Sequence, residues 1–488
     1  MRRNYKNIEP DHKAPAKLYK DGKFIAELSC QVWFPRHNHE RPFLLFDSTD
    51  KDHEAIGSIS QFCDVFMDIV KLGNRRINIY ARRMIVENFL RTHHSPVLPP
   101  LITFEGIPEA IIETVSLGTD ADSTEKSHNV IYLMDNFLLS PSKIIERSYT
   151  GETKVKDVRI HKDLIEGLGE VTFDKHFYTV SLDDGGTASY RKLVAVFDTE
   201  QHIKDIAFFE SAIKPIIDDY LLLASFASEQ MTNILGFMSS NEHSLIRGWY
   251  GNVIVRSPER KRHHSHNDVL IDMMDFPDFM HLAATAFSRF DADQKHLIRR
   301  AIYNVLPGTG TVESNMLRHF SAIESILLVH RRQNDMEFTI SKTSHWNKLA
   351  KSLRKTVREN ESLFTTTDHM QMLIKMLPSL RRVPLQDAFY SFIKERNIDL
   401  SDLWPVFGPA EGATLSDVRN KLIHGDSFKD ERFISLSHAM SNTECVAKRL
   451  ILSILGWNID KSSISKGILK TYGWIPNSDL AKDMRLLS

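Results

Sequence analysis

The sequence has few cysteines and no long apolar run. Cys30, Cys63 and Cys445 are its three cysteines among 488 residues, and they lie far apart. We therefore expect neither a disulfide framework nor a cysteine-based zinc site, and the free thiols fit a reducing compartment. No uncharged apolar run approaches the roughly 20 residues that span a bilayer, and the polar first residues do not resemble a signal peptide. These absences predict a soluble, cytoplasmic protein with no membrane partner.

The chain also lacks an excess of either charge. It carries 62 Lys and Arg against 63 Asp and Glu, and 42% of its residues are hydrophobic. This balance excludes a protein that binds polyanions over its whole surface, so any contact with nucleic acid must come from local patches. A chain of 488 residues is too long for one ordinary core and indicates about two to four domains.

Sequence motifs for phosphate loops and metal sites are also lacking. Gly308-Thr309-Gly310 has the composition of a helix-breaking linker rather than of a phosphate-binding loop. Histidines gather at 36–40, 93–94 and 263–266, each time in loop-like sequence near a proline. None of these clusters has a second ligand cluster at the spacing of a zinc site. We therefore expect no metal and no cofactor.

The first 200 residues are rich in strand patterns. Between Phe24 and Phe34 apolar side chains recur at every second residue, which predicts a half-buried strand. Further strands are expected at 76–80, 130–133, 177–182 and 190–197. The sequence Asp-Asp-Gly-Gly at 183–186 supplies turn chemistry between the last two. With a helix expected within 58–72, residues 1–200 are predicted to form a sandwich-like or mixed β-rich domain.

The pattern changes in the middle of the chain. Residues 203–235 have mainly helical spacing, and Pro215 marks a helix start or a kink. A short strand is expected at 252–256. Residues 257–268, with a proline and a run of basic residues and histidines, are typical of an exposed loop between domains. We interpret 201–268 as a connector.

Beyond Phe276 nearly every pattern is helical. Helices are expected at 291–305, 311–332, 344–359, 367–376, 386–395, 414–425 and 432–455. Thr414 can cap the sixth of these, with Asp417 three residues on, and Gly425 can end it. The predicted fold class is therefore α+β: a β-rich N-terminal region, an all-α bundle over 269–460 and an extension over 461–488.

One predicted helix carries residues suited to RNA cleavage. Asn420 and His424 are four positions apart and share a helix face, and Arg419 lies about 100° around the helix. A histidine titrates near neutrality and can take a proton from a 2′-hydroxyl. An arginine can stabilise the charge that grows on the phosphate, and an amide can orient either group. This set predicts cleavage of RNA without a metal.

The spacing of these residues is not specific by itself. Arg256 with His263 and Arg260 with His266 are similarly spaced, but they lie in the predicted loop, where nothing fixes their geometry. The alternative interpretation of 414–425 is a capped surface helix with a histidine stabilised at its C-terminal end by the helix dipole. Both interpretations remain open at the level of spacing.

The wider context adds a family resemblance. The string Val-Arg-Asn-Lys-Leu-Ile-His-Gly, residues 418–425, resembles the signature of HEPN domains, which are helical bundles with this motif on a late helix. The resemblance implies a metal-independent endoribonuclease whose composite site forms across a homodimer or higher homo-oligomer. Arg419, Asn420 and His424 would be its catalytic residues. RNA would be the substrate, with tRNA among the candidates, and the product would end in a 2′,3′-cyclic phosphate.

The order of the two regions resembles the ApeA-type bacterial defence proteins. That resemblance implies an abortive-infection role, in which a phage-derived trigger switches on RNA cleavage. The β-rich region would then sense infection or restrain the nuclease. A different class of function also stays open: a non-catalytic dimerisation or RNA-binding module, with the activity in the β-rich region.

Glu324 is the supporting residue that the resemblance suggests. It lies between Phe320 and Leu327 on an apolar helix face, where a carboxylate is costly unless it is paired. Pairing with Arg419 would satisfy the carboxylate and aim the guanidinium, and HEPN domains often carry such an acidic residue. The alternative is a carboxylate at the wet edge of the apolar face.

A basic stripe is the candidate RNA-binding surface. Its members recur at helical spacing or lie within the motif: Lys348, Lys351, Lys355, Arg358 and Lys421. Such a stripe can follow a line of phosphates. The alternative interpretation is an ordinary solvated helix face.

Overall fold

The structure is a computed structural model, and it contains two compact units, residues 1–265 and 266–488, which are treated separately below. The residues that it describes are 9–35, 41–49, 62–71, 75–92, 101–116, 126–140, 142–147, 153–159, 161–181, 187–200, 203, 205–251, 269–308, 310–408, 410–425, 428, 430–471 and 477–488. As predicted, a β-rich N-terminal region precedes a helical C-terminal region, so the fold is α+β.

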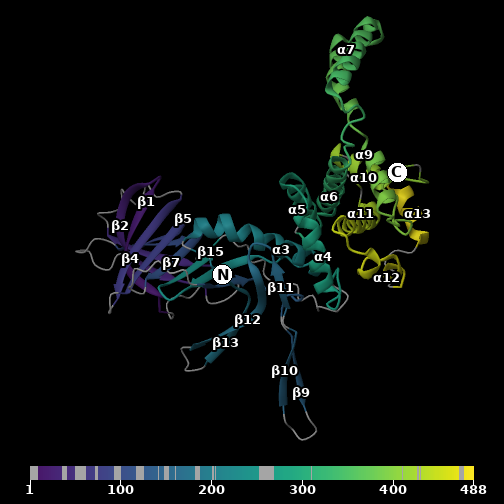
Figure 1. Cartoon of the computed structure of the whole chain (residues 1–488). Helices are drawn as coiled ribbons and strands as arrows, with labels where there is room; N and C mark the ends of the chain where they lie inside the picture. The colour runs from purple at the N-terminus through teal and green to yellow at the C-terminus, as the bar shows by residue number, and fades with distance from the viewer. Residues whose placement is uncertain are drawn as a thin grey trace. The chain divides into compact units, whose positions relative to one another are not determined.

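An antiparallel sheet dominates the first unit. Within the described residues its thirteen strands follow the order β11-β12-β13-β8-β14-β15-β7-β5-β4-β1-β2-β3-β6. The strands are β1 His12–Lys20, β2 Lys23–Trp33, β3 Phe43–Thr49, β4 Cys63–Lys71, β5 Arg75–Thr92, β6 Leu101–Ile107, β7 Ala110–Ser116, β8 Ser127–Leu133, β11 His161–Ile165, β12 Gly169–Ser181, β13 Thr187–Thr199, β14 Ile234–Ser240 and β15 Ser244–Tyr250. A separate hairpin joins β9 Ser142–Arg147 and β10 Thr153–Arg159 (Figure 1).

The strand predictions are confirmed where the structure describes them. In β2, Ala26, Leu28, Cys30 and Val32 are buried as the period of two requires, whereas Phe24 is exposed. The expected strands at 76–80, 130–133 and 190–197 lie within β5, β8 and β13, and β12 covers 177–181. β12 and β13 pair antiparallel, while the turn sequence at 183–186 lies outside the described residues.

The helix expected within 58–72 is wrong for the part described. Residues 63–71 form β4, because Cys63, Val65 and Met67 alternate into the core, and a period of two is a strand pattern.

The helix expected over 203–235 is too long. It breaks into α2 Ile206–Phe208, a π-helical turn η3 Phe209–Ile213 and α3 Lys214–Ser228, with Pro215 in the first turn of α3. Glu229, at a φ of 53°, ends α3, and the chain returns to the sheet as β14 and β15. The expected connector therefore contributes two central strands, and the segment at 252–268 lies outside the described residues.

The second unit is helical, and the seven helices that were expected are present with closely matching bounds. They are α5 Ala292–Val305, α6 Val312–Gln333, α7 Thr343–Glu359, α8 Thr367–Met376, α9 Leu385–Glu395, α10 Leu415–Ile423 and α11 Phe433–Ile454. Three further helices had no predicted bounds: α4 Phe276–Ser288, α12 Lys466–Thr471 and α13 Asn477–Leu486. Short 3-10 turns are η4 Glu361–Leu363, η5 Leu377–Arg381, η6 Asp430–Arg432 and η7 Ile459–Lys461.

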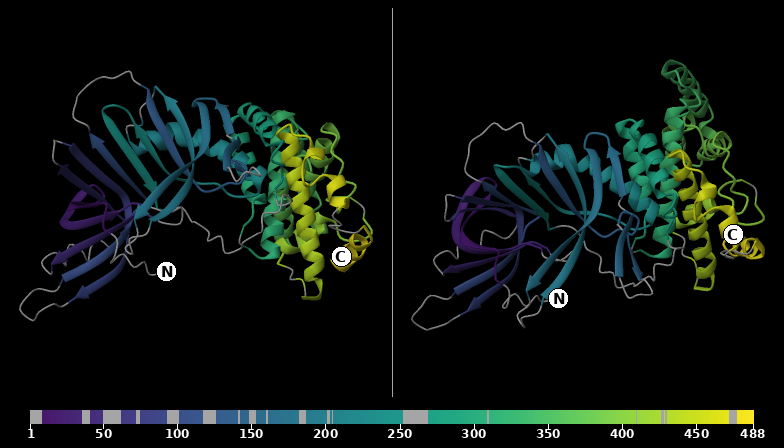
Figure 2. Two further views of the ribbon diagram at one scale, coloured as in Figure 1. Left: turned by 90° about the horizontal axis from the view of Figure 1, so that it is seen from below. Right: turned by 60° about the horizontal axis from the view of Figure 1, so that its bottom comes forward.

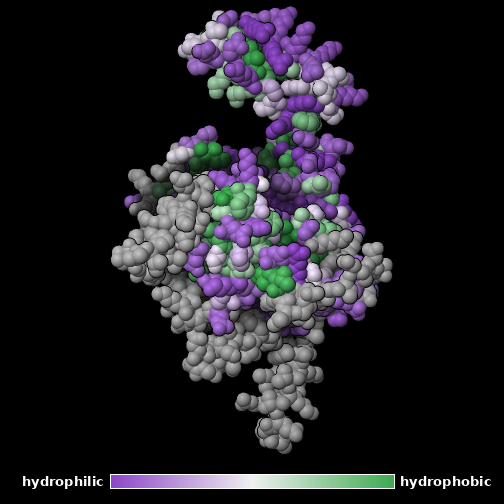
Figure 3. Space-filling model, turned by 90° about the vertical axis from the view of Figure 1, so that its left-hand side faces the viewer, coloured by the Kyte–Doolittle hydropathy of each residue, from purple (hydrophilic) through white to green (hydrophobic). Residues whose placement is uncertain are grey.

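The two longest helices form the centre of this unit. α6 packs against α11, α5 and α9, and α13 packs against α11; the long helices run side by side in Figure 2. α7 instead packs with α8 and η5, in the lobe at the top of Figure 3. None of the helices in the described part of the chain is long and apolar enough to cross a membrane.

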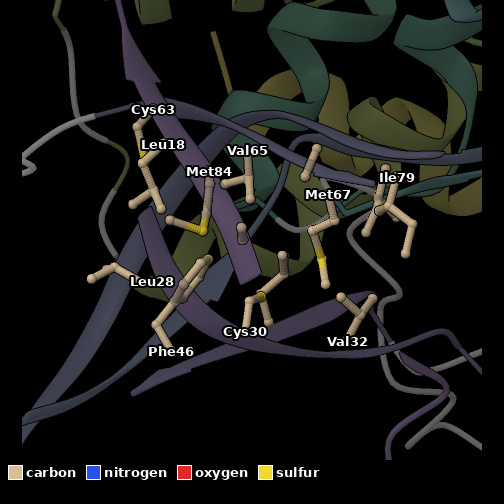
Figure 4. Packing of buried hydrophobic residues seen from close by; sticks show 14 of the residues in the cluster. Leu18, Leu28, Cys30, Val32, Phe46, Cys63, Val65, Met67, Ile79 and Met84 are labelled. Carbon is tan, nitrogen blue, oxygen red and sulfur yellow. The ribbon is translucent and has the colours of Figure 1, made fainter. Parts of the chain in front are cut away.

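The cysteines lie within the two cores. β6 pairs with both β3 and the second half of β5, so this end of the sheet rolls back on itself around an apolar cluster that includes Cys30 and Cys63 (Figure 4). Burial raises the pKa of the Cys63 thiol to about 12 and that of Cys30 well above its usual value. Cys445 is also buried, and the three cysteines are not joined in disulfides. Because buried thiols react poorly, we expect them to be inert.

Candidate active site around Arg419

Local sequence fixes the helix that carries the candidate site. The Thr414 hydroxyl accepts a hydrogen bond from the Asp417 backbone N–H at 3.2 Å, and Asp417 accepts one from the Thr414 N–H at 2.9 Å. This capping box starts α10 as predicted. Gly425, at a φ of 85°, follows its end. Val418 is fully buried, so the back of α10 packs inward and its other face carries the polar side chains.

Three contacts hold the Arg419 guanidinium in place. Nη2 of Arg419 lies 2.5 Å from Oε1 of Glu324 on α6, and Nη1 donates to Oδ1 of Asn420 at 3.0 Å. The guanidinium carbon lies 5.4 Å from the centre of the Phe320 ring, at the distance of a cation–π contact. A charge pair, an amide and a ring therefore restrict both the position and the plane of the guanidinium.

The expected contact between Glu324 and Arg419 is present, although Glu324 is not buried. Its side chain is 35% exposed and that of Arg419 is 27% exposed. The carboxylate therefore lies at the solvent-exposed edge of the apolar face and is also paired with Arg419. An ion pair this open to solvent contributes no more than about 1 kcal/mol to folding. The geometry therefore orients Arg419 more than it stabilises the unit.

The arginine retains donors for a ligand. A guanidinium has five N–H donors, and the described hydrogen bonds engage one on each Nη nitrogen. Because the side chain is partly exposed, an anion arriving from solvent can meet the remaining donors. Arg419 is thus suited to bind a phosphate in a fixed orientation.

His424 lies at the C-terminal end of α10, one turn after Asn420. Its backbone N–H donates to the Asn420 carbonyl at 3.0 Å, which keeps it on the helical path, and both side chains are exposed. The structure thus brings Arg419, Asn420, His424 and Glu324 to one end of α10 and the facing part of α6. The His424 imidazole is thus accessible to a ligand that arrives from solvent.

Lys421 is turned to a structural contact. Its ammonium donates to the carbonyl of Leu487, at the end of α13, at 2.9 Å. Because this contact holds the C-terminal residues against α10, we assign Lys421 to packing rather than to the predicted basic stripe.

The other four members of the stripe share one surface of α7. Lys348, Lys351, Lys355 and Arg358 line a hollow of about 570 Å³ together with Arg354, Ser352 and Glu359. The sequence interpretation missed Arg354, although its spacing from Lys351 was a usable signal. This surface belongs to α7 and not to the helices around Arg419.

The three histidine clusters considered for metal binding, 36–40, 93–94 and 263–266, lie outside the described residues. Within the described part of the chain, no group of three or more His, Cys, Asp or Glu side chains is arranged to hold a metal ion.

Sequence reasoning also missed a polar cluster between α11 and α13. Nδ1 of His438 lies 2.7 Å from one carboxylate oxygen of Asp483, and the Ser435 hydroxyl donates to the other at 2.7 Å. Asp483 is buried and His438 is 37% exposed. No local pattern could predict this cluster, because Asp483 lies 48 residues after Ser435 and 45 residues after His438, on a different helix. It fastens α13 to the bundle.

Comparisons with protein-family models, with curated proteins and with solved structures found no match to the chain. The residues that bear on function are therefore those of the 418–425 motif and the side chains that contact them.

Proposed function

We propose that the helical unit is a HEPN-type, metal-independent endoribonuclease. The observation that carries the proposal is the Arg419 guanidinium, aimed by Glu324 and Asn420 while still partly exposed, on the same helix and five residues before an exposed His424. Cleavage of RNA at its own 2′-hydroxyl uses a fixed cation at the phosphate and an imidazole that moves a proton, and the motif carries one of each.

In the proposed reaction Arg419 and Asn420 bind the scissile phosphate. His424 takes the proton from the 2′-hydroxyl, or gives a proton to the departing 5′-oxygen. Attack of the 2′-oxygen on phosphorus forms the new P–O bond and breaks the P–O5′ bond. The products are therefore a 2′,3′-cyclic phosphate and a free 5′-hydroxyl.

A single copy of the motif supplies one imidazole, whereas the reaction uses both a base and an acid. We propose that a second copy of the chain supplies the other, so that the site is composite and the protein acts as a homodimer or a higher homo-oligomer. An exposed α10 end is consistent with a facing copy.

We further propose that this activity serves an abortive-infection defence against phage in the cytoplasm. The sheet unit would sense a phage-derived trigger or restrain the nuclease, and tRNA is a candidate substrate. The order of the two regions and the motif support this role. The role is tested separately from the cleavage reaction, and either can be wrong without the other.

The chemistry is tested with purified full-length protein and RNA in the presence of a chelator. Wild type should cleave, and His424→Ala should not. His296→Ala, which removes an exposed histidine of α5, is the matched control and should cleave like wild type. Equal cleavage by wild type and His424→Ala would remove His424 from the mechanism.

A second candidate is a non-catalytic dimerisation or RNA-binding module. It is favoured by one observation: the Arg419 contacts lie within the fold, and those with Glu324 and Phe320 can serve as a clamp between α10 and α6. In that case Arg419→Ala lowers thermal stability, and wild-type protein leaves every tested RNA intact.

A further inference from the structure

Residues 338–382 form a helical insertion between α6 and α9 whose two ends lie together, here called the basic arm. Its ends meet in a β-bridge between Phe338 and Arg382. The Thr339 N–H donates to the Arg381 carbonyl at 2.8 Å, and the Arg381 guanidinium lies 4.2 Å from the Phe338 ring centre. Because the chain leaves and returns at one point, the arm is a distinct lobe, and in Figure 1 α7 projects from the rest of the helical unit.

The arm concentrates positive charge that the whole chain does not have. Residues 338–382 contain nine Lys and Arg against three Asp and Glu, whereas the chain as a whole has 62 against 63. The lobe is mostly hydrophilic in Figure 3. A local excess of this kind attracts polyanions even when the whole protein is neutral.

α7 places its charges and its apolar side chains on opposite faces. Trp346 and Ala350 are buried on the side that packs with α8 and η5. Lys348, Lys351 and Lys355 are exposed, and with Arg358 they fall within an arc of about 80° at 100° per residue. From the first to the last the stripe runs roughly 15 Å along the axis.

The dimensions and chemistry of the stripe suit a phosphate backbone. A length of roughly 15 Å corresponds to about four phosphates along one strand of a duplex. Arg354 adds a fifth cation to the same hollow. Among the described ion pairs, these cations have one acidic partner: Lys355 lies 3.5 Å from Glu359, with both side chains largely exposed. A pair so exposed gives way readily to a phosphate.

The same helix is poorly suited to a lipid surface. An interfacial helix buries its apolar face among the acyl chains, but the apolar face of α7 is already occupied by α8 and η5. The exposed apolar residues of the arm are Leu349 on α7, Leu363 on η4, Met372, Leu373 and Met376 on α8, and Leu380 on η5. At 100° per residue Leu349 lies about 100° from Lys348 and outside the arc of the stripe. The face of α7 that carries the stripe is therefore cationic rather than amphipathic.

We propose that the basic arm docks RNA by its phosphate backbone along Lys348, Lys351, Arg354, Lys355 and Arg358. The docking surface lies on a different element from Arg419 and would hold a strand that the active site cleaves. The choice of RNA as the occupant rests on the proposed ribonuclease function.

Binding of a fluorescein-labelled single-stranded RNA, followed by fluorescence anisotropy over a range of salt concentrations, tests the proposal. Full-length Arg419→Ala protein is the background, so that the RNA stays intact. Adding Lys348→Gln, Lys351→Gln and Lys355→Gln should weaken binding by at least about tenfold at low salt and reduce the slope of log affinity against log salt by about 2. These side chains are exposed, so the thermal midpoint should not change.

The matched control removes three exposed cations from elsewhere in the same unit: Arg289→Gln, Lys394→Gln and Lys470→Gln. It changes the net charge equally and should leave both affinity and slope unaltered. Equal effects of the two triple variants, or no effect of the stripe variant, would overturn the docking surface. Stripe-dependent binding to vesicles containing phosphatidylglycerol, without stripe-dependent binding to RNA, would also overturn it.

The two proposals fail in distinguishable ways. If RNA binding depends on the stripe but the protein cleaves no RNA, the proposed ribonuclease activity is excluded and the docking surface is retained. The opposite result is cleavage that depends on His424, with binding and cleavage both unchanged in the stripe variant. It would retain the ribonuclease and exclude the docking surface.

Discussion

Arg419 joins a local motif to a contact that the motif does not contain. Its partner Glu324 lies 95 residues earlier in the chain, and the pair could be anticipated because Glu324 shares a helix face with Phe320. The 35% exposure of Glu324 could not be anticipated, since it depends on how α10 lies across α6. The sequence therefore predicted that Glu324 pairs with Arg419, but it did not predict how exposed this ion pair is to solvent.

Replacing Glu324 by Gln separates orientation from stability. The amide keeps the shape but loses the charge that aims Arg419, so RNA cleavage should fall by about tenfold, while the free energy of unfolding falls by less than about 1 kcal/mol. Single-turnover cleavage and urea denaturation measure the two effects. Glu411→Gln, at an exposed position, should change neither; a large loss of stability with unchanged cleavage would contradict the orienting role.

His319 makes the stability of the helical unit depend on pH. Burial lowers its pKa to about 4, against an ordinary value near 6.5 in the unfolded chain. The folded state keeps the ring neutral while the unfolded state takes up a proton, so stability is complete above about pH 6.5 and falls toward pH 4, by up to about 3 kcal/mol.

Urea midpoints at several pH values check this dependence. His319→Gln should flatten the profile between about pH 6.5 and 4, because the titrating ring is gone. His296→Gln, which replaces an exposed histidine, should leave it unchanged. An identical profile for wild type and His319→Gln would show that other groups cause the loss.

At the scale of elements, the helices were predictable and several strands were not. The bounds of α10 follow from Thr414, Asp417 and Gly425, which act within a few residues of the helix ends. β4 was predicted to be helical because its short alternation was read with the wrong period. β14 and β15 were missed because their place depends on pairing with β8 and β7, which lie far away in sequence.

Gly425→Ala tests how the end of α10 is held. Gly425 has a φ of 85° and no atom within 4 Å of an added Cβ, so the cost is backbone strain alone, about 1 kcal/mol. Because His424 precedes it, cleavage should fall as well. Gly467→Ala in α12 also meets open space but without a positive φ, and it should be neutral or stabilising by up to about 1 kcal/mol. Equal urea midpoints for both variants would argue against a strained turn.

At the scale of the whole molecule, composition and periodicity predicted the succession of a β-rich region and a helical one. They could not predict the strand order, in which β8 lies between β13 and β14, because such pairing is set by packing rather than by local preference. The site that we propose also needs a second copy of the chain. Such sequence patterns describe one chain and do not specify how two copies meet.

Mixing wild-type and His424→Ala protein tests the composite site, because each proposed site needs one imidazole from each copy. If each site draws on both copies and the copies exchange freely, equal mixing leaves about a quarter of the pairs fully wild type. Cleavage should therefore fall below half of the unmixed value at the same total concentration. A mixture with half the activity would indicate that each copy works alone. Arg289→Ala protein, mixed in the same way, should leave activity unchanged.

The central claim is that Arg419 and His424 cut RNA in cells under infection. Sequencing of RNA ends, after expression of wild-type or Arg419→Ala protein with and without phage, tests it most directly. We predict new 2′,3′-cyclic phosphate and 5′-hydroxyl ends at shared positions with the wild-type protein, and their loss with Arg419→Ala at equal protein abundance. The same ends at the same frequency with both proteins, or no new ends with wild type under infection, would contradict the account.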